Sequence, residues 1–175
     1  MLLWQTNTFS RPSDMAQTTT RERPRLAASV QGKIDFSSEI LQLAASAAAL
    51  QFQSASEAEF SGDAVESYAL PAWLPPIDSW LPHGALLALG LERNTTSQPE
   101  MLGTCGIDPH LDSIHGLVFV VVIHNDGLKF KQARQIHQTG IGEWFVFDDR
   151  LSHGVNDTKK STCYLCITVP LRHTT

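Results

Sequence analysis

The sequence predicts a mainly β domain, an antiparallel sandwich or barrel, with one helix before it. Three observations lead to this prediction. Short apolar segments follow one another from residue 85 to residue 171, with little helical periodicity between them. Residues 116–125, GLVFVVVIHN, form an almost unbroken β-branched run, which is typical of a strand buried on both faces. Only residues 36–53 have apolar side chains at helical spacing over a longer stretch.

The size and charge of the chain limit its class. It has 175 residues and a formal net charge of −5, so we expect one domain at residues 35–175 with its core at residues 85–171. The charge argues against general nucleic-acid binding, and no apolar run reaches the roughly 18 residues that span a bilayer. The first residues lack a signal-peptide pattern, and the three cysteines cannot form a full disulfide framework. We therefore expect a cytoplasmic protein without a membrane partner.

The first part of the chain is expected to be a flexible arm followed by the helix. Residues 1–34 are polar and lack any period, which is typical of an arm. The helix at residues 36–53 can begin at a Ser37 or Ser38 cap, and it is expected to pack outside the sheet. Its predicted apolar face consists of Ile40, Leu43, Ala44, Ala47 and Leu50.

Residues 54–84 read as an irregular connector. Four prolines between positions 71 and 82 prevent long regular structure. Large apolar side chains in the same stretch are expected to hold the connector against the core. These are Trp73, Leu74, Ile77, Trp80 and Leu81.

The strands are predicted from short apolar or alternating segments. Asn125-Asp126-Gly127 predicts a tight turn, after which the chain returns along residues 128–132. Cys163 and Cys166 have CxxC spacing, but on a strand they point to opposite faces, so we interpret them as core residues. The predicted strands are residues 85–93, 100–107, 116–125, 128–132, 134–139, 142–149 and 161–171.

One pattern could carry chemistry. His110-Leu111-Asp112 places an imidazole and a carboxylate two residues apart, and on an extended chain both project to the same side. His153 follows the predicted strand at 142–149 and can supply a second imidazole. Two histidines and one carboxylate form the facial triad of non-haem Fe(II) oxygenases. An H-x-D triplet alone is common, and Asp108, in an Asp-Pro turn, is the alternative carboxylate.

These residues resemble the iron(II)/2-oxoglutarate-dependent dioxygenase superfamily over residues 85–171. The resemblance consists of His110-x-Asp112, the buried run after it, the GEWFVFDD segment at 142–149, and the distal His153. It implies a double-stranded β-helix, or jelly roll, in which His110, Asp112 and His153 hold Fe(II). It further implies 2-oxoglutarate as cosubstrate and O₂ as oxidant. The implied activity is hydroxylation of a small-molecule or side-chain substrate, with release of succinate and CO₂.

The resemblance also implies a basic residue for the far carboxylate of 2-oxoglutarate. Lys160, followed by Ser161, is nearest in form to the family's basic pattern, and Lys159 is its overlapping rival. Lys129 and Lys131 are further possibilities. A lysine offers a point charge where arginine would offer a two-pronged fork.

Two other functions fit the same residues. One is a cupin-like metal protein that shares the jelly roll and does not use 2-oxoglutarate. The other is a catalytically silent jelly-roll binding module in which His110 and Asp112 are structural. The sequence identifies neither the substrate nor the oligomeric state.

Overall fold

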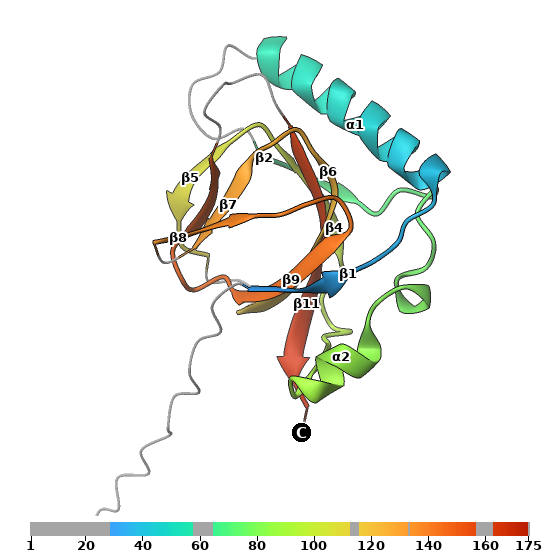
Figure 1. The fold of residues 1–175 in the computed structure, drawn as a ribbon, viewed down its shortest axis with the longest axis vertical. Coiled ribbons are helices and arrows are strands. Elements are labelled where there is room, and N and C mark those ends of the chain that lie inside the picture. The colour runs from blue at the N-terminus through green and yellow to red at the C-terminus, as the bar shows by residue number, and fades with distance from the viewer. Residues whose placement is uncertain (1–28, 58–64, 113–115, 133, 157–162, 175) are drawn as a thin grey trace, which may run out of the picture.

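The computed structural model describes residues 29–57, 65–112, 116–132, 134–156 and 163–174. Two antiparallel sheets in these residues form the expected jelly roll (Figure 1). In the larger sheet the order is β1-β9-β6-β11-β4-β2, and β3 pairs with β11; in the smaller it is β5-β10-β7-β8. The larger sheet contains β1 (Ser29–Lys33), β2 (Val65–Ala69), β3 (Leu91–Arg93), β4 (Glu100–Thr104), β6 (Leu117–Asn125), β9 (Glu143–Asp148) and β11 (Tyr164–His173). The smaller sheet contains β5 (Ile107–His110), β7 (Lys129–Gln132), β8 (Gln135–Gln138) and β10 (His153–Asn156).

Strand β6 is buried on both faces, as its β-branched run predicts. Its side chains alternate between two apolar clusters. Phe119 and Val121 belong to the cluster on the outer face of the larger sheet, whereas Val118 and Val120 belong to the cluster between the sheets. This position, between β9 and β11, makes β6 the centre of the core.

The helix α1 (Ser38–Glu57) packs outside the larger sheet, as expected (Figure 1). The Ser37 hydroxyl caps it by accepting a hydrogen bond from the Ile40 N–H at 3.3 Å. The predicted apolar face is only partly correct. Ala44 and Ala48 are buried, but Leu43 and Leu50 are 38% and 68% exposed. Apolar residues lie on several sides of this helix, so their spacing alone does not select the buried side.

Residues 29–33 differ from the expectation of an arm that extends to residue 34. They form β1, which pairs antiparallel with β9 at the edge of the larger sheet. Gly32 permits this pairing, because an added Cβ would lie 2.7 Å from the Trp144 indole nitrogen. Residues 1–28 of the predicted arm lie outside the described residues.

The prediction of one strand at residues 85–93 was wrong for its first part. His83–Ala88 form helix α2, and only Leu91–Arg93 form a strand. The segment ALLA consists of good helix formers without a β-branched residue, which explains the helix. A short 3₁₀ helix, η1 (Ile77–Ser79), precedes it. The connector does pack on the core: Leu74, Ile77 and Leu81 are buried, and Trp73 and Trp80 contact the same cluster.

The turn at 125–127 forms, but it does not make a β-hairpin. Strand β7 pairs with β8 and β10 in the smaller sheet, and not with β6. The Asn125 side chain fixes the turn by accepting from the N–H groups of Gly127 and Leu128 and donating to the Thr139 carbonyl. The turn therefore carries the chain from β6 in the larger sheet to β7 in the smaller sheet.

Among the described residues, no helix combines the length and the apolar character needed to cross a membrane.

Candidate metal centre

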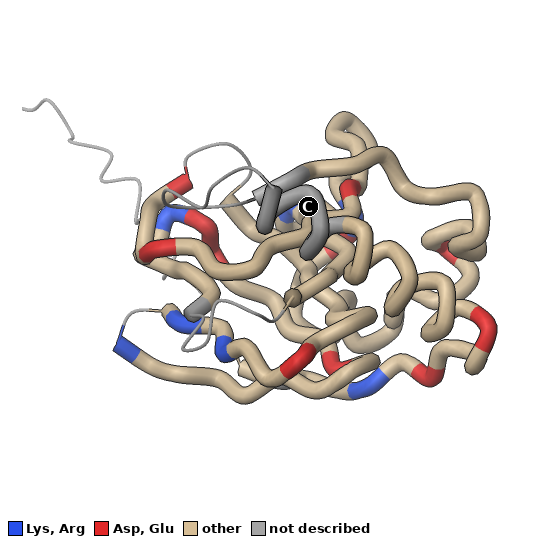
Figure 2. The backbone as a smooth tube through the Cα atoms, turned by 90° about the horizontal axis from the view of Figure 1, so that it is seen from above, with Lys and Arg blue, Asp and Glu red and all other residues tan. Residues whose placement is uncertain are grey.

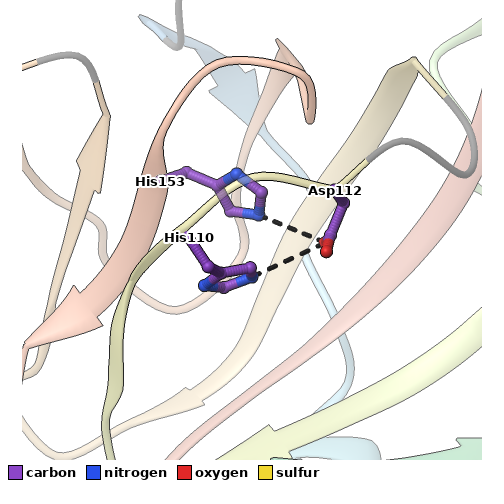
Figure 3. A group of neighbouring side chains, drawn as sticks. All are labelled: His110, Asp112 and His153. Carbon is purple, nitrogen blue, oxygen red and sulfur yellow. Dashed lines mark ion pairs between the residues drawn. The ribbon is translucent and has the colours of Figure 1, made fainter.

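The structure brings together the three side chains that the H-x-D pattern and the distal histidine single out. His110 ends β5, Asp112 follows it by two residues, and His153 begins β10, where it is paired directly opposite His110. One ligand atom from each lies within 4.8 Å of the others. In Figure 3 both imidazoles point toward the Asp112 carboxylate. Asp112 Oδ2 lies 3.6 Å from His110 Nε2 and 3.5 Å from His153 Nε2.

Backbone hydrogen bonds fix the tautomer of both histidines. His110 Nδ1 donates to the Asp108 carbonyl at 2.8 Å, and His153 Nδ1 donates to the Leu151 carbonyl at 2.9 Å. A carbonyl oxygen only accepts, so Nδ1 carries the proton in each ring. The lone pair is then on Nε2, the atom that faces Asp112. Imidazoles that bind metals are oriented in the same way, by a hydrogen bond from the other ring nitrogen.

His153 is also kept neutral by its surroundings. Burial lowers the pKa of His153 below its ordinary value, and the neighbouring His110 acts in the same direction. The Phe147 ring packs edge-on against it, with ring centroids 4.8 Å apart. A neutral imidazole is the form that binds a metal. The donor set of two imidazole nitrogens and one carboxylate oxygen therefore fits a divalent transition metal.

Close contact between β5 and β10 depends on Gly154. A Cβ at this position would lie 2.7 Å from the Ile107 carbonyl oxygen and 3.1 Å from the Pro109 nitrogen. Both of these atoms are backbone and cannot move aside without shifting β5. The small residue after His153 thus permits the approach that places His110 beside His153.

Asp149 holds the loop that carries Asp112, a role that the sequence analysis missed. Its carbonyl accepts from the Asp112 N–H at 3.0 Å, and its carboxylate accepts from the Gly116 N–H at 2.9 Å. Its own N–H donates to the Gly116 carbonyl at 2.8 Å. Asp149 therefore fixes both sides of the loop between β5 and β6. Asp149 is buried, with 2% of its surface exposed.

A cavity of about 370 Å³ lies between the sheets next to the three ligands. Its walls are mostly apolar, with fewer polar residues among them. The lining alternates along the strands, so that one face of each strand is turned inward. The apolar lining consists of Leu102, Ile107, Val118, Val120, Phe130, Phe147 and Val155, and the polar lining includes Glu100, Thr104, Asp149, Tyr164 and Thr168.

None of the described lysines or arginines lines this cavity. On β7, Phe130 faces the cavity, so Lys129 and Lys131 lie on the opposite face of the strand. Neither lysine therefore lines the cavity beside the three ligands. Lys159 and Lys160 lie outside the described residues. Figure 2 shows both Lys and Arg positions and Asp and Glu positions spread over the described backbone.

The remaining candidates fall into structural positions. Asp108, the alternative carboxylate, is exposed and is not part of the ligand group. The Asp148 carboxylate forms a two-pronged ion pair with Arg150, with contacts of 2.7 and 2.6 Å, and this pair is part of the turn after β9. Trp144 is buried against Phe119 in the outer cluster and is a core residue.

Comparisons with known proteins add information on the fold alone. No protein-family model and no curated protein matched the sequence. Among solved structures, a Pseudomonas putida prolyl-4-hydroxylase is 19% identical, with 85% of this chain and 93% of that chain covered and a TM-score of 0.45. AviO1 from Streptomyces viridochromogenes Tue57 is 10% identical, with coverage of 83% and 89% and a TM-score of 0.46. The cupin domain of an XRE-family transcriptional regulator from Enterobacter cloacae is 12% identical, with coverage of 60% and 94% and a TM-score of 0.37.

Proposed function

We propose that this protein is a non-haem Fe(II) oxygenase that uses His110, Asp112 and His153 as its metal ligands. The observation that carries the proposal is the meeting of these three side chains, with both Nε2 lone pairs turned toward one carboxylate. A facial set of this kind leaves coordination positions open for substrate or O₂. When bound, iron would supply the activation of O₂ that no side chain of the chain can provide.

The protein's own contribution is geometry and exclusion of water. His110 and His153 are held at fixed orientation by the carbonyls of residues 108 and 151, and Asp112 is held through Asp149. The adjacent apolar cavity would hold a small, mainly apolar molecule or side chain against the centre. Val118, Phe130 and Phe147 are the walls expected to set the shape of that substrate.

We further propose 2-oxoglutarate as the cosubstrate, with hydroxylation of the substrate coupled to release of succinate and CO₂. This finer assignment rests on the resemblance of the H-x-D and distal-histidine pattern to the 2-oxoglutarate-dependent enzymes. The far carboxylate of 2-oxoglutarate needs a cation, and Lys160 or Lys159 is the proposed partner.

The test measures iron binding and turnover separately. Full-length protein is titrated anaerobically with Fe(II), and succinate formation from 2-oxoglutarate is then followed in air. We expect His153→Ala to bind Fe(II) at least about 100-fold more weakly and to form no succinate. His83→Ala is the matched control, because His83 is exposed at the start of α2 and lies apart from the ligand group. Equal Fe(II) affinity in wild type and His153→Ala would refute the metal centre.

Lysine variants test the cosubstrate. Lys160→Ala and Lys159→Ala are compared with Lys129→Ala, whose lysine is exposed on the face away from the cavity. We expect either Lys160→Ala or Lys159→Ala to lose succinate formation. Lys129→Ala should form succinate like the wild type. Normal succinate formation by both would contradict the assignment of these lysines.

A second candidate is a metal-dependent enzyme of the cupin type that does not use 2-oxoglutarate. The observation that favours it is the cavity lining, where the described residues include the acids Glu100, Asp112 and Asp149 but no lysine or arginine. Tight Fe(II) binding with no succinate formed, together with O₂ uptake on addition of small apolar compounds, would support this candidate over the first.

A further inference from the structure

Two buried cysteines far apart in the sequence meet at one end of the larger sheet. The sulfur atoms of Cys105 and Cys163 are 2.9 Å apart, although the residues are 58 positions apart. Cys105 is 1% exposed and Cys163 is 2% exposed. This contact is closer than the roughly 3.5–4 Å optimal for non-bonded heavy atoms, so the two thiols already interact directly.

The strand register explains why they meet. Strands β4 and β11 are antiparallel, and Thr104 is paired with Tyr164. The next positions outward along the two strands are Cys105 and Cys163, which therefore lie opposite each other. Opposed residues of antiparallel strands have Cα atoms about 4.5–5.5 Å apart. This separation is within the range of about 4.4–6.8 Å that a disulfide requires.

The backbone around Cys163 is fixed by the turn after β6. The Asp126 carboxylate accepts from the Cys163 N–H at 3.2 Å, and the Asp126 N–H donates to the Cys163 carbonyl at 3.1 Å. His124 in turn contacts Asp126 at 3.0 Å. These contacts hold Cys163 in place opposite Cys105 without a metal. Among the described residues, three or more potential metal ligands converge only at His110, Asp112 and His153.

The third cysteine is placed differently. Cys166 belongs to the cluster between the sheets and lines the cavity, and burial raises the pKa of its thiol to about 12. Its cross-strand partners are Leu102 and Val122, so no described thiol lies opposite it. Cys166 should therefore stay reduced.

We propose that Cys105 and Cys163 form a reversible disulfide by exchange with a low-molecular-weight disulfide. In the first step one cysteine, as thiolate, attacks a sulfur of the small disulfide, which forms a mixed disulfide and releases one small thiol. The second cysteine then loses its proton and attacks the protein sulfur of the mixed disulfide, and a second small thiol leaves. The protein dithiol is oxidised by two electrons and the small disulfide is reduced to two thiols.

The bond would tie the end of β4 to the start of β11. Thr104 and Tyr164, the chain neighbours of the two cysteines, line the cavity. Oxidation would therefore fix this part of the cavity wall and close a long loop of the unfolded chain. The expected result is a rise in Tm on the order of 10 °C for a chain of this size.

The experiment uses the full chain without added iron. One sample is kept in dithiothreitol, and another is incubated with oxidised glutathione and then freed of it. Free thiols are counted after denaturation, and disulfide-linked peptides are mapped by mass spectrometry. We expect the three thiols of the reduced chain to fall to one, with Cys105 linked to Cys163, a higher Tm, and full reversal by dithiothreitol.

Two variants make the result specific. On oxidation, Cys166→Ala should still lose both of its remaining free thiols, and its Tm should rise as much as that of the wild type. Cys105→Ala should form no intramolecular disulfide, and its Tm should not rise on oxidation. The proposal is overturned if oxidised wild type keeps three thiols, stops at a glutathione adduct, or links Cys166. Because the wild-type measurement requires no substitution, a variant that fails to fold does not remove the test.

Discussion

At the residue scale, the candidate metal centre depends on backbone groups as much as on its three ligands. The carbonyls of Asp108 and Leu151 each fix one imidazole, and each belongs to the residue two positions before the histidine it holds. The Asp112 N–H is held by the Asp149 carbonyl. All three ligands are thus oriented by short-range or loop-closing hydrogen bonds, and this reduces the reorganisation required when a metal binds.

Asp149 is the residue whose removal should loosen this arrangement without removing a ligand. Asp149→Ala leaves the Gly116 N–H without its acceptor, so we expect Fe(II) affinity to fall about 10-fold, as for other groups that orient metal ligands. Asp149→Asn keeps an acceptor oxygen and should recover most of the affinity. Anaerobic Fe(II) titration measures both. An affinity for Asp149→Ala equal to that of wild type would show that the loop is held without this carboxylate.

At the scale of elements, the position of β5 against β10 determines whether the two histidines can meet. His110 and His153 are a cross-strand pair, and Gly154 lies directly against the backbone of β5. The relative position of the two histidine ligands therefore depends on how these two short strands pack against each other. Strand β1 shows the same dependence in the other sheet, where Gly32 packs against the Trp144 ring.

Gly154→Ala tests the contact between β5 and β10. Its Cβ would displace the Ile107 backbone, so we expect Fe(II) affinity to fall by about 10-fold or more as His110 moves from His153. Gly84→Ala is the matched control, because a Cβ there meets nothing within 4 Å. Anaerobic titration gives the affinities, and circular dichroism checks that both variants are folded. Unchanged affinity in Gly154→Ala would mean that β5 moves without consequence for the ligands.

Gly32→Ala tests whether β1 contributes to the domain. The added methyl group would collide with the buried Trp144 indole, and we expect the free energy of unfolding to fall by about 1–3 kcal/mol. Chemical denaturation compares this variant with Gly84→Ala, which lies in helix α2 and should be neutral or slightly stabilising. Equal unfolding midpoints for Gly32→Ala and wild type would indicate that β1 is not part of the cooperative fold.

At the scale of the whole molecule, one apolar cluster lies on each face of the larger sheet. One lies beneath α1 and the connector, and the other fills the space between the sheets around the cavity. Tyr164 and Cys166 are acids buried in the second cluster, and burial raises the pKa of both. The stability of the whole fold is therefore linked to pH through groups that have no part in the proposed metal set.

The direction of this pH dependence follows from proton release. The pKa of Cys166 rises from 9.0, the ordinary value of an exposed thiol, to about 12 in the folded state. Unfolding thus releases a proton above pH 9, and the free energy of unfolding should fall by roughly 1 kcal/mol per pH unit between about pH 9 and 12. Tyr164, whose pKa is raised well above 10.0, adds to the loss at higher pH.

Urea unfolding from pH 7 to pH 10.5 measures this loss. Cys166→Ala removes one titrating group, so its unfolding free energy should fall less steeply above pH 9 than that of wild type. Tyr164→Phe should flatten the curve mainly above pH 10. Wild-type stability that stays constant to pH 10.5 would contradict the burial of both acids.

Local sequence was sufficient for the features that local physics controls. The β-branched run at 117–125 specified a strand buried on both faces, and Ser37 marked the start of α1. The two-residue spacing of His110 and Asp112 placed their side chains on one side of an extended segment. The cap and the spacing act within a few residues of the chain, and the burial of the strand on both faces is indicated by its own run of apolar residues. The local pattern is therefore sufficient to predict each of them.

The tertiary structure alone decided which distant segments meet. It paired β7 with β10 and not with β6, set β1 against β9, and brought Cys105 to Cys163. It also placed His153 opposite His110 and chose the alanine side of α1 for burial while leaving Leu50 exposed. Apolar periodicity reports that a face is buried but carries no information on its partner, because many partners satisfy the same hydrophobic gain. The choice among them depends on register, close backbone approach and the turns that carry the chain between the sheets.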